Sequence, residues 1–128
     1  WTSVRRLKQL MGGSMRQSGI LAAAGLHALE HHISRLSLDH RHAKQLAVGL
    51  SDLGPKIAVE NTSPDTNMIF FRWKGSMSPS EFSEACQSNG VRFSQVGQDR
   101  FRGVTHLGID EKKILRAIQI VSEVCSGE

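Results

Sequence analysis

The sequence has few aromatic residues and no tyrosine, and this scarcity narrows the range of functions. Its aromatic residues are five phenylalanines and two tryptophans, 5% of a 128-residue chain. RNA-binding sheets of the RRM type present a string of exposed aromatic residues, and KH domains carry a GxxG loop in a characteristic pattern. Neither pattern occurs here. We therefore expect no nucleic-acid partner, and a basic module that binds RNA or another anion is the alternative hypothesis.

Cysteines and long apolar runs are also scarce. Cys86 and Cys125 are far apart in helical patterns, so we expect reduced intracellular thiols rather than a disulfide framework. No apolar run approaches the roughly 20 residues that a membrane-spanning helix needs. The first six residues do not resemble a secretory signal. These absences predict a protein with no membrane partner, located in the cytoplasm or alternatively in the mitochondrion.

The charge balance favours anionic partners. The formal net charge is +4, and the composition of 39% hydrophobic and 22% charged residues is ordinary for a globular protein. A basic surplus attracts nucleic acid and phosphate-bearing cofactors alike. Charge alone therefore does not choose between a binding module and an enzyme.

Helical periodicity dominates the first half of the chain. Apolar residues recur at three- and four-residue steps in two segments, Ala22 to Leu36 and Ala43 to Leu53. Ser37 is the predicted N-cap of the second helix, and Gly54-Pro55 is expected to end it. We assign residues 1–36 to linking helices and residues 37–128 to a C-terminal small domain.

The second half alternates between strands and helices. β-rich runs predict strands at residues 56–60 and 67–73, with two more near 91–95 and 101–106. The segment Ser78-Pro79-Ser80-Glu81 has the form of a capping box, and Asp110 is expected to cap a closing helix. The fold class expected is α+β, with N-terminal helices followed by a small, mainly antiparallel sheet and packed helices.

The stretch from Met11 to Ile20 contains a candidate anion site. Gly12 and Gly13 interrupt a basic helical pattern shortly before the second helix, and Arg16 follows them. Unpaired N–H groups and the positive end of a helix attract phosphate, and an arginine adds a charge-assisted hydrogen bond. The alternative interpretation is an inter-helix turn with an exposed arginine.

A second candidate lies on the last predicted strand. Arg100 and Arg102 project from the same face because side chains alternate along a strand. A guanidinium group can hold a carboxylate through two parallel hydrogen bonds. A strand-borne arginine can equally be a solvated surface charge, so the residues alone leave both interpretations open.

Histidines crowd the first two helices but do not form a metal motif. The cluster consists of His27, His31, His32, His40 and His42. His27 and His31 have the spacing at which one helix face can offer two ligands, but no HExxH pattern is present. We expect solvated histidines and no metal site.

Two motifs resemble the low-specificity L-threonine aldolases. The first runs from Arg5-Arg6 through Gly12-Gly13 to the segment Met15–Gly25, and the second is Arg102-Gly103-Val104-Thr105-His106-Leu107. Both occur in the family's order and separation, and the resemblance covers only the C-terminal part of such an enzyme. It implies the aspartate-aminotransferase fold type, pyridoxal 5'-phosphate as cofactor, and cleavage of L-threonine or L-allo-threonine to glycine and acetaldehyde.

The resemblance also implies roles for individual residues. Arg102 would hold the carboxylate of the amino-acid substrate. Arg16 would meet the cofactor phosphate across a subunit boundary of a homo-oligomer (a homotetramer in the family) with a shared active site, and Gly12 and Gly13 would permit that approach. Two positions depart from the family pattern, because Ser14 replaces a usual third glycine and Gly103 replaces a larger apolar residue.

The resemblance places the family's Schiff-base lysine before Trp1. The lysines at positions 8, 44, 56, 74 and 113 belong to helices or loop edges and do not match it. We therefore expect no catalytic residue in this chain and an inactive fragment when it is alone. A non-catalytic remnant that assembles with intact subunits is a further alternative.

Overall fold

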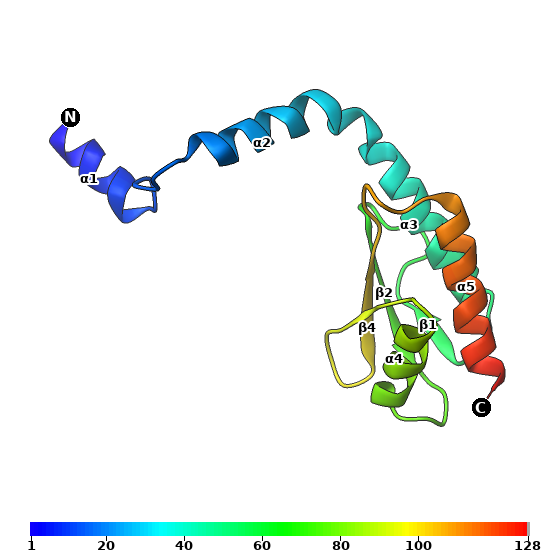
Figure 1. Cartoon of the computed structure of the whole chain (residues 1–128). Helices are drawn as coiled ribbons and strands as arrows, with labels where there is room; N and C mark the ends of the chain where they lie inside the picture. Colours follow the sequence, from blue (N-terminus) through cyan, green and yellow to red (C-terminus); the bar gives the residue numbers. More distant parts are fainter. Residues whose placement is uncertain (128) are drawn as a thin grey trace. The chain divides into compact units, whose positions relative to one another are not determined.

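A computed structural model describes residues 1–127, which fall into two compact units, Trp1–Arg35 and Leu36–Glu128. The first unit contains α1 (Thr2–Leu10), α2 (Gly19–His31) and the 3-10 turn η1 (Ile33–Arg35). The helices of the second unit are α3 (Leu36–Ser51), α4 (Pro79–Ser88) and α5 (Glu111–Ser126) (Figure 1).

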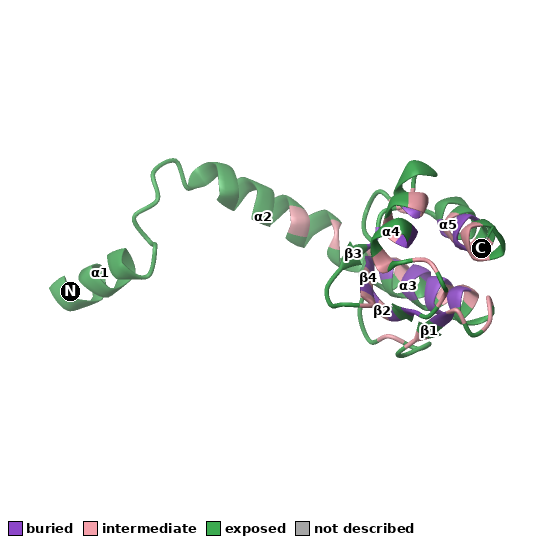
Figure 2. Cartoon of the chain, turned by 90° about the horizontal axis from the view of Figure 1, so that it is seen from below, coloured by how far each residue is buried: buried purple, intermediate pink, exposed green. Residues whose placement is uncertain are grey.

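The first unit is helical but has no core. None of its residues is buried, and its ribbon in Figure 2 carries almost no colour other than that of exposed residues. The side chains of Leu26 and Leu29, part of the predicted apolar stripe, are 60% and 63% exposed. Helix formation here therefore reflects local propensity, without the burial that normally stabilises an amphipathic helix.

The second unit is built on a four-stranded sheet. Its strands are β1 (Ile57–Val59), β2 (Met68–Trp73), β3 (Ser94–Gln95) and β4 (Arg100–Val104), in the order β1-β2-β4-β3. All three neighbouring pairs are antiparallel, which confirms the predicted α+β class. β3 is shorter than expected because Val91 N–H donates to the carbonyl of Cys86, 3.0 Å away, and so closes the end of α4 instead of extending the sheet.

The core lies between one face of this sheet and the three helices of the second unit, which lie on the same side of it in Figure 1. Phe71 is fully buried at its centre. Its ring stacks on Phe101 at a centroid distance of 5.5 Å and meets Phe93 edge-to-face at 5.0 Å. Strand alternation sends Phe71 of β2 and Phe101 of β4 inward and their neighbours along each strand outward.

The helix ends of the second unit follow their sequence signals, with one exception. Ser78 forms the predicted capping box with Glu81, and the carboxylate of Asp110 accepts from the N–H of Lys113 at 2.9 Å. Gly90, at φ +91°, occupies the left-handed conformation expected after α4. The prediction that Ser37 is an N-cap is wrong. α3 starts at Leu36 directly after η1, so Ser37 lies inside the helix.

Candidate functional site

The face of the sheet that the helices leave uncovered is rich in arginine. Register places Phe70 opposite Arg102 and Arg72 opposite Arg100 on the two central strands. These four side chains alternate with the buried ones and therefore share the outer face. Arg100 and Arg102 thus lie on one face, as the alternation of the sequence predicts.

Arg100 is held by an acidic residue from a distant part of the chain. Its Nε and Nη2 donate to the two carboxylate oxygens of Glu60 at 2.7 and 2.8 Å, a two-pronged ion pair. The same guanidinium lies 4.1 Å from the centre of the Phe70 ring. The hydrogen bond from Arg100 lowers the pKa of Glu60 below its usual value, and Glu60 raises the pKa of Arg100 in return. Arg100 is therefore already engaged.

Arg72 is engaged as well. Its Nη1 donates to Asp99 at 2.6 Å, and Lys74 Nζ donates to the other oxygen of the same carboxylate at 2.7 Å. The pKa of Asp99 is lowered, first by the hydrogen bond from Lys74 and then by that from Arg72. Two acidic side chains, Glu60 and Asp99, are thus ion-paired with three of the cations on and beside this face.

Arg102 differs from both neighbouring arginines. It lies between Phe70 and Ser94 on the central strand, half-buried, and among the described residues no carboxylate pairs with it. Its Nε is buried and has no hydrogen-bond partner within residues 1–127. A buried donor without an acceptor is costly, and a guanidinium fork matches a carboxylate. The arrangement therefore leaves one guanidinium on the sheet able to take an anionic ligand.

The glycine segment of the first unit forms the turn between α1 and α2. Gly12 has a φ of +83°, a conformation that favours glycine. A Cβ on Gly13 would lie 2.5 Å from Lys8 Cγ and 2.6 Å from the Lys8 carbonyl oxygen, so only glycine fits there. Ser14 does not have a positive φ, so the turn accepts a serine in place of the third glycine.

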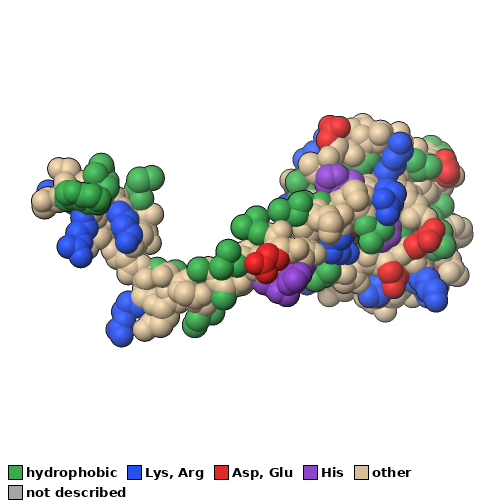
Figure 3. Space-filling model, turned by 90° about the horizontal axis from the view of Figure 1, so that it is seen from above, with side chains coloured by type: hydrophobic (Ala, Val, Ile, Leu, Met, Phe, Trp, Pro, Cys, Tyr) green, Lys and Arg blue, Asp and Glu red, His purple; other side chains and the backbone are tan. Residues whose placement is uncertain are grey.

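Arg16 is exposed in this turn, and among the described residues it has no hydrogen-bond or ion-pair partner. Its position just before α2 leaves it able to meet a phosphate. Arg16 and Arg102 belong to different units, so their joint use in one site stays a prediction. Figure 3 shows exposed apolar side chains interspersed with Lys and Arg on the surface of the first unit.

Three lysines of the second unit, Lys56, Lys74 and Lys113, lie in structural contacts. Lys56 Nζ donates to the carbonyl of Cys125 at 2.7 Å, and Lys113 Nζ donates to the carbonyl of Gly108 at 2.6 Å. Lys74 is bound to Asp99, as described above. Within residues 1–127, no lysine of the sheet's strands lies on the outer face beside Arg102.

His27, His31, His106 and Cys86 make structural contacts in this fold. The His27 ring packs edge-to-face against His31 at a centroid distance of 4.4 Å, and the described residues contain no group of three or more potential metal ligands. Burial raises the pKa of the Cys86 thiol to about 12. His106 Nδ1 accepts from the N–H of Gly108 at 3.2 Å in the turn after β4.

No helix among residues 1–127 combines the length and the apolar character that crossing a bilayer requires.

Glu60 and Asp99 were not recognised from the sequence as part of this site. Glu60 is 40 residues from Arg100, and Asp99 is 27 residues from Arg72. Both lie in segments that read as turns or strand ends. Only the pairing of β1, β2 and β4 brings these carboxylates to the arginines, so no local signal could have identified them.

Comparison with known proteins adds an independent observation. The profile of the Beta-eliminating lyase family matches residues 2–74, which include the glycine segment but not Arg102. The low specificity L-threonine aldolase of Escherichia coli (strain K12) is 35% identical over 109 residues, 85% of this chain and 31% of that protein. Low-specificity L-threonine aldolase 1 of Arabidopsis thaliana is 35% identical over 104 residues, 80% of this chain and 29% of that protein. The chain thus spans about a third of the length of these relatives.

Proposed function

We propose that this chain, which belongs to the Beta-eliminating lyase family, is the C-terminal portion of a pyridoxal-phosphate-dependent aldolase that cleaves L-threonine or L-allo-threonine to glycine and acetaldehyde. The observation that carries the proposal is the unpaired guanidinium of Arg102, set among arginines that are already neutralised. The names of the relatives supply the substrate class, and Arg102 supplies the group that would bind it.

Arg102 would act by orientation. Two parallel hydrogen bonds from its guanidinium would fix the substrate carboxylate and thereby restrict rotation about the substrate's Cα. The bond between Cα and Cβ would then stand perpendicular to the cofactor ring, and such alignment is a large source of rate. Pyridoxal phosphate, when bound, supplies an electron sink for the pair released as this bond breaks.

Arg16 would bind the phosphate group of the cofactor. Its exposed side chain follows the turn at Gly12 and Gly13, whose lack of side chains would permit close approach, and a guanidinium group suits a phosphate dianion. By this proposal it does so in a neighbouring subunit. The first unit offers many exposed apolar side chains, including Leu21 and Ile20, which are 59% and 73% exposed, and burial against further protein would stabilise them.

The substrate role can be tested in a chimera that joins the upstream part of the Escherichia coli relative to this chain. Acetaldehyde release from L-threonine measures activity. Arg102→Gln should raise KM for L-threonine by about 100-fold, because about 3 kcal/mol of charged hydrogen bonding is lost. Arg72→Gln is the matched control on the same face and should change KM by less than about threefold. An unchanged KM in Arg102→Gln would overturn the assignment.

The same chimera tests Arg16. Arg16→Gln should weaken binding of pyridoxal phosphate by about tenfold, the effect of losing one charged contact to a phosphate. Arg41→Gln changes another exposed arginine, on α3, and should leave the affinity unaltered. Equal affinities for the two variants would remove Arg16 from the cofactor site.

The isolated chain should release no acetaldehyde from L-threonine when pyridoxal phosphate is added. The proposal gives it no Schiff-base lysine. Threonine cleavage by the purified chain, lost on removal of the cofactor, would contradict this part of the proposal. The same preparation shows by sedimentation whether the chain assembles with itself.

Nucleic-acid binding is the competing hypothesis, and the outer face of the sheet argues against it. Phe70 is the aromatic residue there, and the guanidinium of Arg100 lies over its ring. A stacking platform needs a free aromatic face. Salt-dependent retention of the chain on a nucleic-acid column would favour this hypothesis over the enzyme.

A further inference from the structure

A cavity of about 600 Å³ lies within the second unit, between the C-terminal end of α4, strand β4 and helix α5. This volume falls in the range of about 300–1,000 Å³ typical of small-molecule sites. Its apolar lining includes Val91, Phe93, Ile114, Ala117 and Ile120, and Gly103 lines it from β4. The cavity opens on the helix-covered side of β4, so it is separate from the outer face that carries Arg102.

Gly103 shapes the wall that β4 contributes. A Cβ at this position would lie 3.0 Å from Ile69 Cγ1 and 3.3 Å from Phe93 Cε1, closer than ordinary packing allows. The glycine therefore lets the Phe93 ring approach the strand and form an apolar wall of the cavity. Gly103, one of the two positions that differ from the pattern of the family that the chain resembles, is thus a position that lines this cavity.

Charge around the cavity is strongly one-sided. Four of the lining residues are cationic (Arg92, Lys112, Lys113 and Arg116), and Asp110 is the one acidic residue in that lining. The Asp110 carboxylate caps α5, because it accepts a hydrogen bond from the backbone N–H of Lys113. An apolar interior beside an excess of positive charge complements a molecule that is apolar at one end and anionic at the other.

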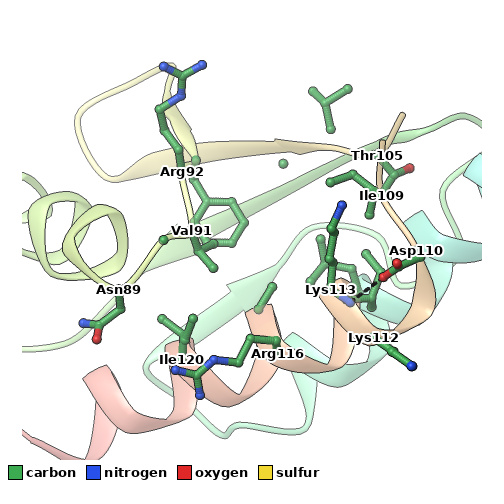
Figure 4. A pocket seen from close by; sticks show the side chains of 17 residues that line it. Asn89, Val91, Arg92, Thr105, Ile109, Asp110, Lys112, Lys113, Arg116 and Ile120 are labelled. Carbon is green, nitrogen blue, oxygen red and sulfur yellow. Dashed lines mark hydrogen bonds between the residues drawn. The ribbon is translucent and has the colours of Figure 1, made fainter. Parts of the chain in front are cut away.

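Lys113 is the cation placed to meet the anionic end. In Figure 4 its side chain rises from α5 toward β4 and Ile109, whereas the Lys112 side chain extends away from the gap. Lys113 Nζ donates to the carbonyl of Gly108 at 2.6 Å. An ammonium group has three N–H donors, so it can still bind a carboxylate. Arg116 lies farther along α5, where its Nη1 is 3.6 Å from Glu123.

We propose that this cavity binds a small amphipathic carboxylate, with an aliphatic chain between Phe93, Ala117 and Ile120 and the carboxylate at Lys113. A neutral apolar molecule would leave the positive charge unmatched, and a polar anion such as inorganic phosphate would leave the apolar walls without contacts. The site is independent of the threonine-cleaving role proposed above.

The probe is octanoate, titrated into the whole chain and followed by amide chemical shifts. We expect saturable shifts confined to residues 89–93, 103–105 and 109–120. Lys113→Gln should weaken binding by about tenfold, the effect of one charged hydrogen bond. Lys44→Gln, an exposed lysine of α3 outside the cavity, is the matched control and should bind as the unaltered chain does. Octan-1-ol, which has the same chain length without the charge, should bind at least about tenfold more weakly.

A second pair of variants tests the cavity itself. Ala117→Leu places three more carbons in the cavity and should abolish the octanoate shifts, while Gln119→Leu places the same leucine side chain at an exposed position of α5 and should not. The proposal fails if octanoate produces no saturable shifts, if octan-1-ol binds equally well, or if Ala117→Leu leaves the shifts intact. Shifts spread over residues 1–35 instead would also overturn it, because they would report adsorption to exposed apolar side chains.

Discussion

Both units of this chain contain segments with apolar residues at helical spacing. Apolar side chains form a buried core in the second unit but stay exposed in the first. In residues 36–127, apolar residues converge on one core in which Phe71, Phe82 and Phe101 are fully buried. In residues 1–35, none is buried. An apolar stripe at helical spacing therefore predicts a helix well, but it predicts burial only where another element lies against it. The exposed apolar side chains of the first unit are the surface that the subunit contact proposed for Arg16 would cover.

The largest expected difference between the units is in core truncation. Phe71→Ala should lower the free energy of unfolding by about 3–5 kcal/mol, because the ring packs against three other aromatic rings. Leu26→Ala, at a 60% exposed position of α2, should change it by less than about 0.5 kcal/mol. Urea unfolding followed by tryptophan fluorescence measures both, and Phe71→Leu keeps the test informative if the alanine variant does not fold. A similar loss for Leu26→Ala would break the contrast.

The next largest difference expected between the two units is in the rate at which a cysteine thiol reacts. The pKa of Cys86 is raised to about 12 by burial, so at neutral pH the folded protein holds it as an inaccessible thiol. In a Cys125→Ser background, Cys86 should react with a thiol reagent at least about 100-fold more slowly than a cysteine introduced as Ala23→Cys in α2. Time-resolved labelling measures the two rates. Comparable rates would mean that the core opens as readily as the exposed helix.

Helix capping offers a smaller, matched comparison. Ser78 accepts from the N–H of Glu81 at 3.3 Å within a capping box, whereas Ser18 stands at the N-cap of α2 without a side-chain cap bond. Ser78→Ala should cost about 1 kcal/mol of stability, and Ser18→Ala should cost close to nothing. Thermal unfolding of both variants makes the comparison. A larger loss for Ser18→Ala would show that the first unit relies on a cap that the structure lacks.

The smallest expected effect concerns the acidic residues on the outer face of the sheet. Because the pKa of Glu60 is below its ordinary value of 4.5 in the folded state, its ion pair stabilises the protein fully above that pH. The contribution is lost as the pH falls through the lowered value, since protonation then breaks the pair with Arg100. Glu60→Gln should remove this pH dependence at a cost below about 1 kcal/mol near neutrality, as for exposed pairs.

A matched control sharpens that last comparison. Glu84 is exposed on α4 and has no ion-pair partner among the described residues, so Glu84→Gln should give the same acid-unfolding profile as the unaltered chain. Acid titration of the unfolding midpoint measures all three proteins. A Glu60→Gln profile identical to that of Glu84→Gln would mean that the pair with Arg100 contributes nothing measurable.

Local signals in the sequence determined much of the second unit. The β-rich run before Trp73, the capping box at Ser78 and the cap at Asp110 each act within a few residues, so their elements lie where the sequence predicts them. Alternation along a strand likewise sufficed to place Arg100 and Arg102 on one face. Ser37 was assigned wrongly because a 3-10 turn leads straight into α3 and leaves no terminus to cap.

Tertiary structure alone decided which arginine is available. Glu60 and Asp99 reach Arg100 and Arg72 only through strand pairing across many residues, and Arg102 is left without a carboxylate partner in the part of the chain that the structure describes. Burial, too, depends on which elements pack together and not on the spacing of apolar residues. The exposure of the apolar helices in residues 1–35 and the cavity beside Gly103 are therefore visible only in the tertiary structure. Sequence specifies what each segment tends to form, and contacts between distant segments determine which side chains are engaged and which remain free to bind.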